Sequence, residues 1–98
     1  MTFIETVIDA WKALSNPAFQ SDYQSTIKRS ADGTRLTIEV TTQQYAATIE
    51  AWEQAYSMDI TAVELISNTG VLLSAGECTS LDEMKERITL LFEMLSKV

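Results

Sequence analysis

Carboxylates and one thiol are the side chains of this chain that could do chemistry. The 98 residues include no histidine, which removes the commonest general base and the commonest metal ligand. Asp82 and Glu83 could exchange protons as a pair, but their spacing from Ser80 predicts the first turn of a helix. Cys78 is either a reactive thiol or a small buried hydrophobe at a strand end. Neither a Gly-x-Gly-x-x-Gly pattern nor a P-loop occurs. We therefore expect no enzyme, no cofactor and no metal site.

Acidic residues are concentrated in the middle of the chain. Eight of them, and no lysine or arginine, lie between Leu36 and Met84, within a chain of net charge -7. Carboxylates on a folded scaffold create a negative field, which attracts and orients a basic protein. Nucleic acid and anionic membranes are poor partners for such a chain, because both require a surplus of Lys and Arg. The alternative interpretation is that the acidity only keeps a small domain soluble.

The single cysteine and the hydropathy pattern bear on the compartment. One cysteine forms no intramolecular disulfide, which suits a reducing cytoplasm. The N-terminus carries Glu5 and Asp9 and lacks the basic segment of a signal peptide. No apolar run reaches the roughly 18 residues that a membrane helix requires. We expect a cytoplasmic protein with a single domain over residues 1–98.

Amphipathic helices are predicted at both ends of the chain. The first starts at a Thr2–Glu5 capping box, and its apolar residues recur at helical spacing: Ile4, Val7, Ile8, Trp11 and Leu14. Asn16-Pro17 should stop it, because the residue before a proline avoids the α region. Residues 17–23 are left open, with Phe19 and Tyr23 expected to pack on the core. The second helix starts at Ser80, and its apolar face comprises Leu81, Met84, Ile88, Leu91, Phe92 and Leu95.

Alternating apolar and polar residues predict strands between the two helices. Residues 24–30 and 35–41 flank Asp32-Gly33, which is a signal for a type I′ hairpin turn. Residues 45–52 alternate too, and a strand is favoured over the helix that their alanines and glutamates would allow. Residues 59–67 and 71–78 flank a turn at 68–70. The order helix, about five antiparallel strands, helix predicts an α+β two-layer sandwich with both helices on one face.

The predicted sheet leaves its other face open, and this face is the candidate site. Glu39, Glu50 and Trp52 alternate with apolar residues, and Glu64 is expected to join them with Ala62 beside it. An aromatic ring among carboxylates is typical of an interface hot spot. In the alternative interpretation, Trp52 turns inward through a bulge and the acids are merely solvated. Tyr56 and Met58 lie in an expected loop that extends the patch. The candidate partner-binding residues are Glu39, Glu50, Trp52, Glu53, Tyr56, Asp59 and Glu64.

The region after Arg35 carries a resemblance to a known family. A strand is followed by the run YAATIEAWEQAYSMDITAVELISNTG, then by another strand and the helix from Ser80. With its Ala51-Trp52-Glu53 and its Asn68-Thr69-Gly70 turn, this region resembles small immunity proteins encoded beside polymorphic toxins, of the TriTu type. The resemblance implies a compact α+β inhibitor of an Rhs-delivered toxin, an ADP-ribosyltransferase that acts on elongation factor Tu. It implies inhibition by occlusion of the toxin active site and supplies no residue-level motif.

Two functions are carried forward from the sequence. The first is an immunity protein, a monomer that forms a heterodimer with a cognate basic toxin. The second is an acidic secretion chaperone, which holds an effector as a homodimer and needs a large hydrophobic dimer surface. Leu90 and Met94 lie off the main stripe of the C-terminal helix and could supply such a surface. On the sequence alone, a monomer in solution favours the first function and a homodimer the second.

Overall fold

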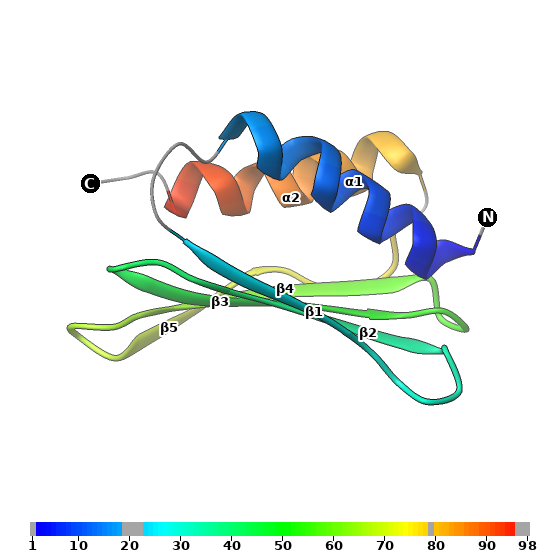
Figure 1. The fold of residues 1–98 in the computed structure, drawn as a ribbon, viewed down its shortest axis with the longest axis horizontal. Helices are drawn as coiled ribbons and strands as arrows, with labels where there is room; N and C mark the ends of the chain where they lie inside the picture. The colour runs from blue at the N-terminus through cyan, green and yellow to red at the C-terminus, as the bar shows by residue number, and fades with distance from the viewer. Residues whose placement is uncertain (1, 19–22, 79, 96–98) are drawn as a thin grey trace.

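The computed structural model describes residues 2–18, 23–78 and 80–95, in which two helices flank five strands. The elements are α1 (Phe3–Ala18), β1 (Gln24–Arg29), β2 (Arg35–Thr41), β3 (Tyr45–Trp52), β4 (Ser57–Glu64), β5 (Thr69–Ser74) and α2 (Leu81–Leu95). Both helices lie on the same face of the sheet (Figure 1). The predicted α+β fold is thus confirmed.

The sheet is an antiparallel meander in the order β1-β2-β3-β4-β5. Each hairpin places sequence neighbours side by side, so short connections suffice. Tyr45–Trp52 is the central strand, which decides between the strand and the helix that its composition allowed. On β2, β3 and β4 every second side chain points at the helices and is buried: Leu36, Ile38, Val40, Ala47, Ile49, Ala51, Met58, Ile60 and Ala62.

The helices close the core from above the sheet. Trp11 of α1 is buried and packs against Phe92 of α2, with ring centroids 5.1 Å apart. Both predicted N-caps form, since Thr2 Oγ1 accepts the amide of Glu5 and Ser80 Oγ accepts the amide of Glu83, each at 3.1 Å. Each cap satisfies an amide that the first turn of a helix leaves without a backbone partner.

One boundary of the helical regions differs from the prediction. The helix α1 continues through Asn16-Pro17 to Ala18, so the proline lies in its last turn and does not stop it two residues earlier. Tyr23 packs against the core as expected. Phe19 and the rest of residues 19–22 lie outside the described residues.

The turns are also wider or shifted compared with the prediction. The first hairpin closes between Ser30 and Arg35 and is not a two-residue type I′ turn, since only Gly33 of the Asp32-Gly33 pair has positive φ. The Asp32 carboxylate causes the difference, because it accepts hydrogen bonds from Ser30 and from Thr34 and holds a longer loop. These bonds lower the pKa of Asp32 to about 2.

The last hairpin is displaced toward the N-terminus. Its turn occupies residues 65–68, where Asn68 adopts a left-handed φ of 56°, and β5 already begins at Thr69. The preceding strand begins at Ser57, so Met58 is a fully buried strand residue and not part of a loop. This correction removes Met58 from the predicted surface patch.

Candidate functional site

The surface of the sheet that points away from the helices is called the open face here. No described helix covers it (Figure 1). Register and burial assign to it the side chains Gln24, Thr26, Lys28, Arg35, Thr37, Glu39, Thr41, Ala46, Thr48, Glu50, Trp52, Ser57, Asp59, Thr61, Val63 and Leu72. The centre of this face is rich in threonine, and its charged and aromatic residues gather toward one end of the strands.

Trp52 lies at the charged end of the open face. Arg35 is its direct cross-strand neighbour, and the guanidinium carbon lies 5.7 Å from the centroid of the tryptophan ring. The same guanidinium donates to a Glu50 oxygen at 2.8 Å. Trp52 pairs in regular register with Arg35 and Ser57, so no bulge turns it inward. Its ring remains half-buried, with apolar surface available to a partner.

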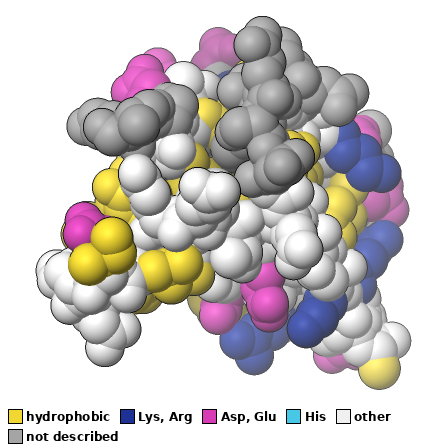
Figure 2. Space-filling model, turned by 60° about the vertical axis from the view of Figure 1, so that its left-hand side comes forward, with side chains coloured by type: hydrophobic (Ala, Val, Ile, Leu, Met, Phe, Trp, Pro, Cys, Tyr) yellow, Lys and Arg dark blue, Asp and Glu magenta, His cyan; other side chains and the backbone are white. Residues whose placement is uncertain are grey.

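The acids on this face are more neutralised than the sequence predicts. Lys28 lies 3.6 Å from a Glu39 oxygen, and Arg35 pairs with Glu50. Both cations lie just outside the acidic window in sequence, but hairpin pairing brings them beside it. Figure 2 shows acidic and basic side chains next to one another in the lower part of the view. The open face is therefore a mixed surface and not a uniformly negative one.

One pair of carboxylates nevertheless lies side by side. Glu50 and Asp59 are direct cross-strand partners on β3 and β4, a placement in which like charges destabilise a sheet. The repulsion between the two carboxylates is reduced by a neighbour of each one. Glu50 pairs with Arg35 on β2, and Asp59 accepts the amide of Gly76 at 3.0 Å. Two adjacent carboxylates next to Trp52 form a small acidic pair, suited to a lysine or arginine of a partner.

Glu53 has a structural role that the sequence reading missed. Its carboxylate accepts the amides of Phe3 at 2.8 Å and Ile4 at 3.2 Å, and so caps the start of α1. Burial raises the pKa of Glu53, but the bonds from Ile4 and Phe3 outweigh it, so the pKa is lowered from its ordinary value. A carboxylate held by two helix amides is poorly available to a partner, and Glu53 is better explained as part of the fold.

Tyr56 lies in the turn after Trp52 and contacts the start of α1, and Glu64 lies on the helix-facing side of the sheet. Tyr56 is 57% exposed at the end of the sheet, adopts a left-handed φ of 47° and meets the edge of Phe3 with ring centroids 5.7 Å apart. Glu64 pairs with Tyr45 and shares the helix-facing side of β4 with Ala62, which is buried. The expectation that Glu64 and Ala62 join the open face is wrong. Glu39, Glu50, Trp52 and Asp59 remain together on it.

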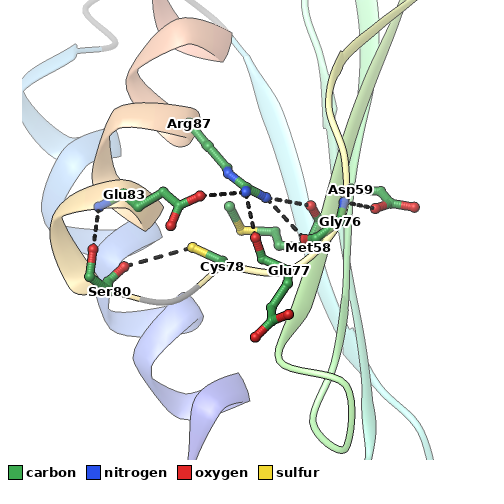
Figure 3. A network of polar contacts seen from close by, with 8 residues as sticks. All are labelled: Met58, Asp59, Gly76, Glu77, Cys78, Ser80, Glu83 and Arg87. Atoms are coloured by element: carbon green, nitrogen blue, oxygen red, sulfur yellow. Dashed lines mark hydrogen bonds and ion pairs between the residues drawn. The ribbon is translucent and has the colours of Figure 1, made fainter.

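Cys78 and Glu83 belong to the cluster of polar contacts that joins α2 to the sheet (Figure 3). Cys78 is buried, and its sulfur lies 3.7 Å from the carbonyl oxygen of Ser80. Burial raises the pKa of this thiol, the opposite of what a nucleophile needs. Asp82 and Glu83 occupy the first turn of α2, where negative charge is favourable.

Arg87 makes most of the hydrogen bonds between α2 and the sheet in this cluster, and the sequence analysis did not identify it. From α2 it donates to the carbonyls of Met58, Gly76 and Glu77 at 3.3, 3.0 and 2.6 Å, and it pairs with Glu83 at 2.6 Å. Figure 3 shows the guanidinium reaching across from the helix to the strand layer. All four acceptors are protein groups of the fold, so this cluster serves structure.

Other kinds of site among the described residues, and relatives of the chain, add nothing to the open face. The described residues include no group of three or more Cys, Asp or Glu side chains placed to hold a metal ion. Among the helices described, none has the length and apolarity to cross a membrane. No protein-family model, curated protein or solved structure matches the chain. The candidate site therefore rests on the geometry of the open face.

Proposed function

We propose that this domain binds a basic protein through the charged end of its open face. The observation that carries the proposal is the pair Glu50 and Asp59 beside the half-buried ring of Trp52, on a face that no described element covers. A partner cation would enter between the carboxylates, and Trp52 would supply the desolvated area that anchors an interface. The ion pairs already present are exposed and worth about 0–1 kcal/mol each, so exchanging them is inexpensive.

We further propose that the partner is a bacterial toxin and that the domain is its immunity protein. This step rests on the resemblance of the region after Arg35 to TriTu-type immunity proteins, which implies an Rhs-delivered ADP-ribosyltransferase toxin. The domain would act in the cytoplasm by covering the toxin active site, one domain per toxin, and would perform no chemistry itself. An uncovered sheet face on a small rigid scaffold suits such a role, because little conformational entropy is lost on binding.

The test is neutralisation of the toxin in cells. If an Rhs-type reading frame lies directly upstream of the gene, its C-terminal domain is the toxin to test. This domain is co-expressed with the wild type or with the double variant Glu50→Lys, Trp52→Ala. We expect the double variant to lose protection. The matched control is Glu64→Lys, which makes the same charge change on the other side of the sheet and should protect fully.

Two results would contradict the proposal. Full protection by the folded double variant would remove the open face as the site. Loss of protection by Glu64→Lys to the same degree would show that net charge matters and the face does not. Thermal unfolding of each variant, compared with the wild type, ensures that a lost activity is not a lost fold.

A secretion chaperone is the second candidate, favoured by one observation. Leu90 points outward from α2 and is half exposed, as a dimer surface on that helix would require. Met94, the other expected contributor, packs against the core. A chaperone binds its effector in a partly unfolded state, whereas an immunity protein binds a folded toxin domain. Titration calorimetry with the folded toxin domain separates the two, because only the immunity function predicts tight binding.

A further inference from the structure

The outer edge of β5 is exposed, apolar and uncharged. Val71 and Leu72 on this strand are 42% and 63% exposed, and Ile66 in the adjoining turn is 89% exposed. Residues 65–76 contain no charged side chain and form the longest uncharged stretch of the chain. Figure 2 shows hydrophobic side chains on the left of the view with acidic side chains near them, whereas the basic side chains lie mainly on the right and below. In the described residues β5 pairs with β4 alone.

The opposite edge of the same sheet, formed by β1, carries charged side chains. The strand β1 also has a single described neighbour, but it carries Lys28 and Arg29. Charged residues, lysine above all, are the usual protection of an edge strand against pairing with another chain. The strand β5 has no charge and no proline that would give it such protection. Because the β1 edge of this sheet carries protective charges and the β5 edge does not, β5 is the edge that is open to pairing with another strand.

We propose that β5 pairs antiparallel with β5 of a second copy of this chain. Pairing of a strand with its own copy is closed by a two-fold axis, and it sets each residue opposite its counterpart or a close neighbour. For a chain of net charge -7, most self-contacts would bring like charges together. The uncharged stretch around β5 avoids this and covers Val71 and Leu72, which favours a second copy over a charged partner.

The dimer has a specific geometry. The axis that relates antiparallel strands of one sheet is perpendicular to it, so the two sheets continue into one and both open faces lie on the same side. Trp52 of each copy stays accessible, because β3 is two strands away from the new junction. The outer side of α2 also stays free. Such a dimer is independent of the partner proposed above. Because it uses the edge of the sheet and not the outer side of α2, it is not the homodimer expected of a chaperone, and it leaves both functions open.

Sedimentation equilibrium of the full chain at rising concentration and salt tests the proposal. Because net charge opposes self-association and salt screens it, we expect the dimer fraction to rise with sodium chloride. Leu72→Lys should raise the dissociation constant about tenfold or more. Lysine lowers the net negative charge of the chain, so a loss of dimer cannot come from stronger repulsion between the whole chains and must come from the contact at β5 itself. Ile27→Lys, the same change on β1, and Leu90→Lys, on α2, should leave the dimer intact.

Three outcomes would overturn the inference. The first is a wild type that stays monomeric up to about 1 mM at all salt concentrations. The second is a dimer that Leu72→Lys leaves unchanged. The third is a dimer that Leu90→Lys dissociates, which would place the contact on α2. Hydrogen exchange gives a readout that does not depend on a substitution, since amides of Thr69–Ser74 should become more protected as the dimer forms.

Discussion

Replacing Arg87 by methionine should cost more stability than any other single surface-accessible change in α2. The side chain is only 14% exposed, and its guanidinium donates to three backbone carbonyls and to Glu83. Methionine keeps an unbranched apolar stem and removes every donor. The substitution therefore isolates the hydrogen bonds from the packing of the stem.

The magnitude follows from the four contacts. Hydrogen bonds from a charged group contribute about 1.5–3 kcal/mol each, but water can reach the carbonyls of Gly76 and Glu77, which belong to exposed residues. Counting mainly the bond to the buried Met58 and the short pair with Glu83 gives a loss of about 3 kcal/mol. For a domain of this size that lowers Tm by about 12–24 °C.

Urea unfolding followed by circular dichroism measures the loss directly. Lys85→Met is the matched control, since it removes one positive charge from an exposed position of the same helix and should change stability by about 0.5 kcal/mol or less. The Met58 carbonyl is a neutral acceptor, so the part of the cost that comes from this bond should persist at high salt, whereas the part that comes from the pair with Glu83 should be partly screened. A cost of Arg87→Met no larger than that of the control would refute the assignment of Arg87 as the joint between the layers.

Two further predictions concern Glu53 and Cys78. Glu53→Gln should lower stability at pH 7 by about 1 kcal/mol, because the cap on Phe3 and Ile4 loses its charge. Since folding lowers the pKa of Glu53, this advantage of the wild type is complete above its ordinary pKa of 4.5, declines as pH falls below it, and is lost below the lowered pKa of the folded state. The cost of Glu53→Gln, measured by urea unfolding, should therefore be smaller at pH 3 than at pH 7, and equal costs would argue against the cap. Cys78 should react with a thiol reagent in urea much faster than in the folded protein, because it is buried and its pKa is raised; fast labelling of the native chain would show that the thiol is accessible.

Alternation in the sequence predicts the strands well and the faces less well. Leu36, Ile38 and Val40 leave no doubt about β2, because the residues between them are polar or charged. In β4 both sets of alternating positions contain apolar residues, so the choice of face depends on where the strand begins. Starting it at Asp59 omits Met58, the residue whose burial places Ala62 and therefore Glu64 toward the helices.

Contacts between distant segments were beyond the reach of the sequence. The cap that Glu53 provides joins residues 50 positions apart, and no local sequence pattern predicts it. Arg87 was hidden for the same reason, because its acceptors are backbone carbonyls and carry no sequence signal. The pairing of Arg35 with Glu50, in contrast, follows once the register of one hairpin is known. For the pair of Arg35 and Glu50, the missing information was the strand register, because both residue types were already known.

The mixed character of the open face changes how acidity should work in this protein. Net charge acts at long range and sets the rate of encounter with a basic partner, wherever on the surface the carboxylates lie. The lifetime of a complex depends instead on the groups that become buried in it, here Trp52 and the adjacent Glu50 and Asp59. Glu64 thus contributes to the rate of encounter as much as Glu50 does. Of the two, Glu50 alone lies on the open face, where a bound partner could contact it. The charge pattern that favours a binding function and the proposed binding site are therefore separate properties, joined only where β3 and β4 bring two of those carboxylates beside a tryptophan.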